Sequence, residues 1–152
     1  MTTGGWTDIP ATLREAGLRV TVPRVAVLSE IQAGQHMTAD QVAAGVRIRV
    51  GAISTQAVYD VLGALTRAGL LRRIEPAGSP TRYETRVGDN HHHVVCRSCG
   101  TIADIDCVAG EPPCLSPAEA GGFIVDEAEV TFWGMCPTCQ TISGVPMTKE
   151  TT

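Results

Sequence analysis

The sequence lacks any apolar run that approaches the roughly 18 residues of a membrane-spanning helix. Its first ten residues, MTTGGWTDIP, also lack the basic segment followed by an apolar segment that marks a secretory signal peptide. These two absences argue against a membrane or exported protein, so we expect a soluble cytoplasmic chain with no membrane partner. The length of 152 residues allows one domain or two small ones.

The chain also lacks the excess of positive charge that is typical of nucleic-acid-binding proteins, because its formal net charge is −4. The charges are unevenly distributed, however. Residues 1–86 contain ten basic and seven acidic side chains, whereas residues 87–152 contain two and nine. This asymmetry indicates an anion-binding module joined to a cation-binding one, although two solvated surfaces that differ by chance would give the same counts.

Three segments of the first module have the sequence signals of helices. Thr21, Thr38 and Ser54 each precede a stretch with helical periodicity and are suitable N-caps. Gln41 follows Thr38 at the spacing of a capping box, and Gly69 is the expected C-cap of the third helix. The sequence therefore predicts three helices that begin near these caps.

The third predicted helix has one apolar side and one polar side. The apolar stripe, which can pack on the first two helices, contains Val58, Val61, Leu62 and Leu65. The outward side chains include Thr55, Gln56 and Tyr59, which can reach base edges and phosphates in a major groove. An ordinary amphipathic helix with a mixed polar face would show the same pattern.

The segment LLRRIEPAGSPTRYET, which follows this helix, favours the DNA-binding interpretation. It alternates, turns at residues 76–79 and alternates again, which predicts a β-hairpin. Three helices followed by a hairpin make a winged helix-turn-helix, in which the hairpin is the wing. The basic residues expected on the wing or near the start of the first predicted helix are Arg19, Arg24, Arg72, Arg73 and Arg82.

Two C-x-x-C pairs, CRSC at 96–99 and CPTC at 136–139, predict a metal site in the second module. Two residues between cysteines let a tight turn direct both sulfurs at one ion, and two such turns complete a tetrahedral shell around zinc. Two independent redox pairs would require a thioredoxin-type context that the sequence lacks. The zinc ligands are therefore predicted to be Cys96, Cys99, Cys136 and Cys139.

The histidines of HHHVVC indicate a second ion, because four thiolates already fill the zinc shell. In an extended strand His91 and His93 share one face. Nitrogen ligands combined with carboxylates suit iron(II), manganese(II) or zinc, and Glu84 and Asp104 are the candidate carboxylates. A solvated polar strand with spare imidazoles is the alternative.

Several of these stretches together resemble the ferric uptake regulator superfamily over nearly the whole chain, from about Leu13 to Cys139. They are GLRVTVPRVAVL, STQAVYDVL, HHHVVCRSCG, Asp104 and WGMCPTC. The pattern is most similar to the peroxide-responsive repressors of this superfamily, which often control catalase or catalase-peroxidase genes and their own genes.

The resemblance implies roles for particular residues. It implies a structural zinc at the four cysteines and one iron(II) or manganese(II) per subunit at a regulatory site. It also implies DNA contacts from Tyr59 and Arg19. The regulatory ligands implied are His36, Glu84, His91, His93 and Asp104.

The chain departs from the superfamily pattern at several positions. Asp60 stands where many relatives have arginine, and Asn90 and Ala128 stand where ligands of a third metal site are expected. We therefore expect no full third site. Asp104 favours the peroxide-sensing branch, whereas Glu84 is more usual in the iron-sensing branch.

The predicted fold class is α+β, with a winged-helix DNA-binding domain over residues 1–86 and a hinge over 87–90. An α/β dimerisation and metal-binding domain follows over 91–145, and residues 146–152 form a disordered tail. The expected function is metal-dependent repression by a homodimer that binds a palindromic operator and responds to hydrogen peroxide. The alternative within this class is an iron-level sensor that represses iron-uptake genes.

Two other classes of protein fit the sequence less well. A zinc base deaminase needs an H-x-E motif, which the chain lacks, and a proline before the first cysteine of C-x-x-C, where the chain has Met135. We therefore expect no enzyme and no small-molecule substrate. A zinc-ribbon interaction module without DNA binding leaves the predicted winged helix without a role.

Neither Cys107 nor Cys114 belongs to the zinc turns, and each is either a redox thiol or a small core side chain.

Overall fold

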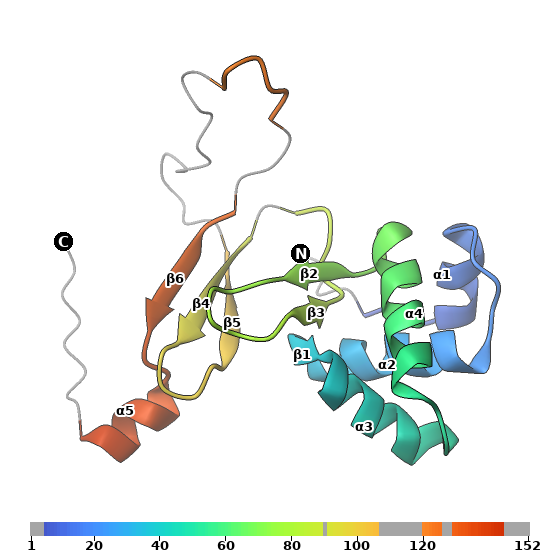
Figure 1. Cartoon of the computed structure of the whole chain (residues 1–152), viewed down its shortest axis with the longest axis horizontal. Coiled ribbons are helices and arrows are strands. Elements are labelled where there is room, and N and C mark those ends of the chain that lie inside the picture. Colours follow the sequence, from blue (N-terminus) through green and yellow to red (C-terminus); the bar gives the residue numbers. More distant parts are fainter. Residues whose placement is uncertain (1–4, 90, 107–119, 126–128, 145–152) are drawn as a thin grey trace. The chain divides into compact units, whose positions relative to one another are not determined.

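The computed structural model describes residues 5–89, 91–106, 120–125 and 129–144, and the chain divides into two units, Met1–Asp89 and Asn90–Thr152. Within these residues the first unit contains four helices and a small sheet, and the second contains another sheet and one helix (Figure 1). The predicted tail, Cys107 and Cys114 lie outside the described residues. No helix among the described residues has both the length and the apolar character required to cross a membrane.

Local capping chemistry determines where the helices of the first unit begin. The hydroxyl of Thr21 accepts a hydrogen bond from the N–H of Arg24, and Thr38 and Gln41 form the predicted capping box. Ser54 caps the fourth helix by accepting from the N–H of Ala57. The helices are α1 (Ile9–Glu15), α2 (Val22–Gly34), α3 (Ala39–Val50) and α4 (Thr55–Arg67).

Two details of the prediction were wrong. Helix α1 was not expected, although Asp8 caps it by accepting from the N–H of Ala11. The C-cap of α4 is Ala68 rather than Gly69, which follows it with a φ of 76°. Glycine suits this position because a left-handed backbone costs it no steric strain.

The core of the first unit lies between its helices. The predicted apolar stripe of α4 supplies the fully buried Val58, Leu62 and Leu65, while Val61 is half-buried. They pack in one cluster with buried apolar side chains of α1, α2 and α3, among them Leu13, Val27, Leu28, Ile31, Val42 and Val46. This packing fixes α4 by one side and leaves its polar side exposed.

A three-stranded sheet of order β1-β3-β2 completes the first unit. The predicted hairpin is present as β2 (Arg72–Ile74) and β3 (Arg82–Glu84), which pair antiparallel. Its turn is closed by a hydrogen bond of 3.0 Å from the N–H of Ser79 to the carbonyl of Pro76. The short strand β1 (Met37–Thr38), which was not predicted, pairs antiparallel with β3.

The second unit is built on a three-stranded sheet of order β5-β4-β6. Strand β4 (His92–Cys96) lies antiparallel to β5 (Ile102–Ile105) and parallel to β6 (Thr131–Gly134). Helix α5 (Pro137–Ser143) follows β6 after two residues. Since β4 and β6 run in the same direction, their carboxyl ends, each followed by a C-x-x-C pair, meet at one edge of the sheet.

Candidate metal centres and nucleic-acid interface

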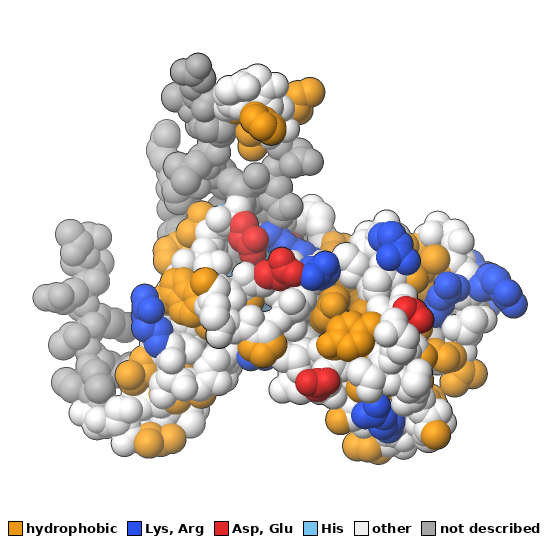
Figure 2. All heavy atoms as spheres, in the orientation of Figure 1, with side chains coloured by type: hydrophobic (Ala, Val, Ile, Leu, Met, Phe, Trp, Pro, Cys, Tyr) orange, Lys and Arg blue, Asp and Glu red, His pale blue; other side chains and the backbone are white. Residues whose placement is uncertain are grey.

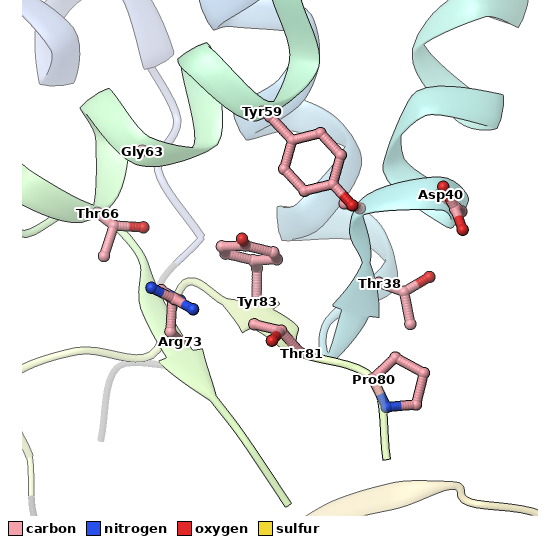
Figure 3. Close-up of a pocket in the computed structure, with 10 residues that line it drawn as sticks. Thr38, Asp40, Tyr59, Gly63, Thr66, Arg73, Pro80, Thr81 and Tyr83 are labelled. Carbon is pink, nitrogen blue, oxygen red and sulfur yellow. The ribbon is translucent and has the colours of Figure 1, made fainter. Parts of the chain in front are cut away.

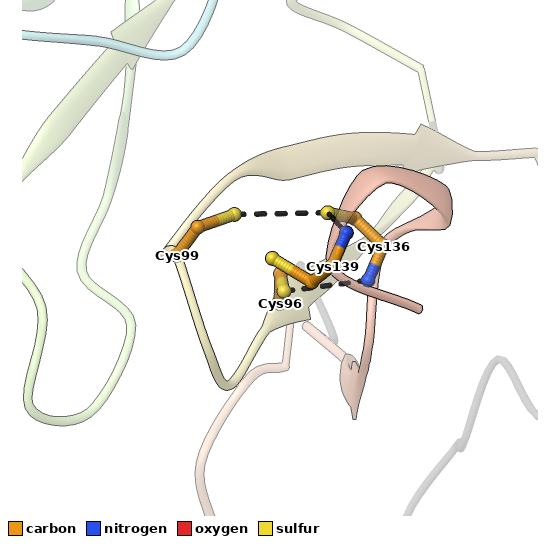
Figure 4. A group of neighbouring side chains, drawn as sticks. All are labelled: Cys96, Cys99, Cys136 and Cys139. Atoms are coloured by element: carbon orange, nitrogen blue, oxygen red, sulfur yellow. Dashed lines mark hydrogen bonds between the residues drawn. The ribbon is translucent and has the colours of Figure 1, made fainter. Parts of the chain in front are cut away.

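Four cysteines meet at this edge of the second unit. Cys96 ends β4, Cys99 lies in the turn after it, and Cys136 and Cys139 lie at the start of α5 (Figure 4). The four sulfurs lie within 4.8 Å of one another, and those of Cys99 and Cys136 are 3.7 Å apart. A tetrahedral zinc site with Zn–S bonds of about 2.3 Å has sulfur–sulfur edges of about 3.8 Å, so the cluster fits zinc.

The backbone around the cysteines places their sulfurs. Gly100 has a φ of 75° and donates its N–H to the carbonyl of Cys96 at 2.9 Å, which closes the first turn. Cys136 is the N-cap of α5, and its Sγ accepts from the N–H of Cys139 at 3.5 Å. Cys136 in turn donates its own N–H to the Sγ of Cys96 at 3.3 Å, which links the two turns.

The thiols of this cluster differ in how readily they ionise. Backbone N–H donors, first that of Cys136 and then that of Cys99, lower the pKa of Cys96 to about 6. A hydrogen bond with Ser98 lowers the pKa of Cys139, but the neighbouring thiols of Cys136 and Cys99 contribute to raising it to about 11. Four thiolates this close repel one another, so a cation is required for all of them to ionise together.

Three further metal-binding side chains converge on one face of the sheet in the second unit. The Nε2 atoms of His91 and His93 are 3.2 Å apart, and they lie 3.7 Å and 3.5 Å from Oδ1 of Asp104. His93 and Asp104 are register partners on β4 and β5. Ligand atoms that share an ion at about 2.1 Å lie about 3.0 to 3.4 Å apart, so these three donors need only small shifts to bind one metal.

His92 points away from these donors, as the alternation of the strand predicts. Its ring packs edge-on against that of Phe132 on β6, with the centroids 6.5 Å apart. His91 and His93 instead pack against each other, with ring centroids 4.8 Å apart. The strand therefore separates the paired imidazoles from the third one.

The first unit places two more predicted ligands together. His36 precedes β1 and Glu84 ends β3, and Nε2 of His36 lies 3.1 Å from Oε2 of Glu84. The other carboxylate oxygen of Glu84 lies 4.0 Å from Nε of Arg72, its register partner on β2. This pair offers one nitrogen and one oxygen at a spacing that fits a shared metal ion.

The exposed side of α4 carries the residues predicted to contact bases. Thr55 accepts a hydrogen bond from Arg47, and Gln56 donates one to Asp60 at 2.9 Å. The side chain of Tyr59 is 47% exposed. The carboxylate of Asp60 therefore restrains the side chain of Gln56 in this structure, whereas the side chain of Tyr59 is accessible to solvent.

A cavity of about 380 Å³ opens between α4, the start of α3 and the hairpin (Figure 3). Tyr59 and Tyr83 contribute aromatic rings to it, and Arg73 contributes a cation. Burial raises the pKa of Tyr83 although Arg73 lowers it, so its hydroxyl keeps its proton at neutral pH. The hydroxyls of Thr38, Thr66 and Thr81 also line the cavity, which is thus rich in hydrogen-bond donors.

The predicted phosphate contacts differ in how far they are exposed. Arg73 is 51% exposed and pairs with Glu75, whereas Arg72 is 16% exposed beside Glu84. Arg19 is exposed, and its carbonyl accepts a hydrogen bond of 2.8 Å from Arg24. On the face drawn in Figure 2, many of the arginine side chains lie over the helical first unit, as the charge distribution predicts.

Sequence reasoning missed three side chains that hold the His36–Glu84 pair. Arg82, expected on the wing surface, donates to the carbonyl of His36 at 3.1 Å. Gln35 and Thr85, the neighbours of the two ligands, bond to each other through two hydrogen bonds. The sequence carries no signal for these contacts because they join segments 46 to 50 residues apart.

Known proteins share both sequence and fold with this chain. A sequence model of the Ferric uptake regulator family matches residues 15–131. The chain is 58% identical over 132 residues to "Transcriptional regulator FurA" of Mycobacterium tuberculosis, which covers 87% of this chain and 90% of that protein. It is 55% identical over 133 residues to "Ferric uptake regulation protein 1" of Mycolicibacterium fortuitum, with coverages of 88% and 83%.

Two solved structures have the same fold. The ferric uptake regulator of Vibrio cholerae matches with a TM-score of 0.65 at 22% identity, over 85% of this chain and 100% of that one. The peroxide stress regulator of Campylobacter jejuni matches with a TM-score of 0.62 at 23% identity, over 88% and 100%.

Proposed function

The chain belongs to the ferric uptake regulator family, and from this premise we propose that it is a homodimeric repressor that binds a palindromic operator and senses hydrogen peroxide. As a metal-dependent transcriptional regulator of this family it binds DNA and is not an enzyme. The observation that carries the finer proposal is the convergence of His91, His93 and Asp104, a nitrogen and oxygen shell suited to a redox-active ion.

The four-cysteine cluster supports a structural role for zinc. Its sulfurs come from two separate segments of the chain, and four thiolates leave no open coordination position for a substrate or water. We propose that Cys96, Cys99, Cys136 and Cys139 bind one zinc ion per subunit and join β4 to the start of α5.

Two incomplete ligand sets support the regulatory site. The first unit offers one nitrogen and one oxygen, from His36 and Glu84, and the second offers two nitrogens and one oxygen. Neither set alone supplies more than three donors, whereas iron(II) and manganese(II) commonly take up to six. We propose that one ion binds both sets, so that metal binding fixes the orientation of the DNA-binding unit relative to the dimerisation unit.

The chemistry of the ligands supports peroxide as the signal. Iron(II) held by these ligands would activate hydrogen peroxide beside the imidazoles. Peroxide is a two-electron oxidant, so one of its oxygen atoms would be inserted into a ring C–H bond of His36 or His91 and the other would leave as water, with no net change in the iron. An imidazole oxidised in this way is a weaker donor, so the ligand sets separate and repression ends. Asp104 favours this branch of the family.

The second candidate function is that of a sensor of iron level. Glu84 favours it, because a glutamate at this position is more usual in the iron-sensing branch. In that case repression follows the iron concentration and the histidines stay unmodified. The target genes then encode iron uptake rather than catalase.

The exposed side of α4 supports DNA binding through Tyr59, and its substitution tests the proposal. Tyr59→Ala is expected to weaken operator binding by about fivefold to a hundredfold, the usual range for a lost base contact. The metal content is expected to stay unchanged, because the Tyr59 side chain lies on the exposed side of α4. Fluorescence anisotropy with operator DNA gives the affinity, and Tyr59→Phe separates the hydroxyl from the ring. Unchanged affinity in both variants would exclude this docking surface.

A further inference from the structure

Gln35 and His36 have an unusual backbone conformation. Their φ angles are 45° and 47°, and among the residues that the structure describes no other non-glycine residue has a positive φ. Gln35 has a ψ of 153°, which together with its φ lies near a region that is populated almost only by glycine. Such a conformation persists only where the surrounding interactions hold it, and it often marks a binding site.

The side chain of Gln35 contributes to holding this conformation, beside the hydrogen bond of 3.1 Å that Arg82 donates to the carbonyl of His36. Nε2 of Gln35 donates to Oγ1 of Thr85 at 2.8 Å, and Oε1 accepts from the backbone N–H of Thr85 at 3.2 Å. Nε2 also lies 3.1 Å from the carbonyl of Gln32, to which it donates. One carboxamide thus forms hydrogen bonds with both the hydroxyl and the backbone N–H of Thr85, which lies 50 positions later in the sequence.

The strand register explains what this contact does. Strands β1 and β3 pair with Met37 opposite Tyr83, and continuing the register places His36 opposite Glu84 and Gln35 opposite Thr85. The positive φ angles turn the backbone of Gln35 and His36 out of the ladder. The Gln35 carboxamide joins this segment to the hydroxyl and the backbone N–H of Thr85, at the position next to the two proposed ligands.

We propose that Gln35 is a positioning residue that presets His36 and Glu84 for the metal. The inference rests on the proposed regulatory site. By fixing Thr85 and the backbone before His36, the contact keeps Nε2 of His36 and Oε2 of Glu84 at 3.1 Å before an ion arrives. The ion then does not have to order two distant segments, so its affinity is higher.

The surroundings of Gln35 distinguish positioning from a general structural role. The side chain is half-buried and lies outside the apolar core of the unit. The hydrogen bond that ends α2 comes from its backbone N–H to the carbonyl of Ile31 at 2.7 Å, so a substitution of the side chain leaves it intact. Removing the carboxamide is therefore expected to disturb the arrangement of His36 and Glu84 more than the folding of the first unit.

The test is titration of the full-length, zinc-loaded protein with manganese(II), with free metal measured by electron paramagnetic resonance. Gln35→Ala is expected to weaken binding by about 10-fold to 100-fold, as is typical when a residue that orients a ligand is lost. The matched control is Gln32→Ala, which removes the same kind of side chain from the last turn of α2, where it bonds to the carbonyl of Trp6. This control is expected to bind manganese like the wild type.

Substitutions of Thr85 test the other side of the contact. Thr85→Val removes only the hydroxyl that accepts from Gln35 and is expected to weaken manganese binding by about threefold to tenfold. Thr85→Ser restores a hydroxyl and is expected to bind like the wild type. In the Gln35→Ala background the effect of Thr85→Val should largely disappear, because the partner is already absent. Additive losses of manganese affinity, or no recovery in Thr85→Ser, would show that the effect does not pass through the Gln35–Thr85 hydrogen bond and would contradict the proposal.

His36→Ala separates failure of the inference from failure of the proposed site. If the wild type and Gln35→Ala bind manganese equally well and His36→Ala does not bind it, the positioning role of Gln35 is wrong but the proposed regulatory site is supported. An equal loss of affinity in Gln35→Ala and Gln32→Ala also contradicts it. If the wild type binds no metal beyond zinc, or His36→Ala binds manganese normally, the regulatory site itself is wrong.

Discussion

Cys96→Ser is expected to abolish zinc binding and to unfold most of the second unit. Cys96 ends β4, and its Sγ accepts from the N–H of Cys136 at the start of α5, so the substitution separates the two turns. The free energy of binding a structural zinc, about 10 to 16 kcal/mol at pH 7, is also free energy of folding. Metal analysis and circular dichroism measure the two losses, and size-exclusion chromatography reports any change in oligomeric state.

The matched control for this prediction is Cys114→Ser, which changes a cysteine outside the two C-x-x-C pairs. It is expected to keep one zinc per subunit and the wild-type spectrum. If Cys96→Ser retains full zinc content and the same oligomeric state, the four-cysteine assignment is wrong.

His93→Ala is expected to abolish the dependence of operator binding on manganese(II) while leaving the zinc in place. His93 is fully buried, and its Nε2 lies within 3.5 Å of both Nε2 of His91 and Oδ1 of Asp104. Loss of a residue that merely orients a ligand costs about 10-fold to 100-fold in metal affinity, so loss of a ligand should exceed 100-fold. Manganese titration and an operator-binding assay measure the two effects.

His92→Gln is the control for this variant, because His92 is adjacent on β4 but packs against Phe132. It is expected to keep manganese-dependent DNA binding. Normal manganese affinity in His93→Ala, or an equal loss in His92→Gln, would show that the paired imidazoles are not the regulatory ligands.

The parts of the fold that could be predicted depend on residues close together in the sequence. Thr21, Thr38 and Ser54 each bond to an N–H three residues later, so their caps could be read locally. The hairpin could be predicted from its turn at residues 76–79. Strand β1 could not, because it has two residues and owes its extended form to pairing with β3, more than forty residues later.

The predicted metal ligands divide in the same way. The spacing of the C-x-x-C pairs and of His91 and His93 indicated that each pair shares a face or a turn, and the structure places their donor atoms together. The pairing of His36 with Glu84 followed only from the resemblance to a family, because no periodicity links the two residues. Gln35 could not be predicted at all, since its role depends on a backbone conformation that glutamine rarely adopts.

Peroxide sensing at the regulatory site is tested by measuring operator binding of the iron(II) and manganese(II) forms before and after hydrogen peroxide, with mass spectrometry of both. We expect that only the iron form loses DNA binding, that a thiol reductant does not restore it, and that a peptide with His36 or His91 gains one oxygen atom. Reversal by reductant would instead indicate a thiol mechanism. Loss of DNA binding with unmodified histidines, or an equal response of the manganese form, would contradict peroxide sensing at this site.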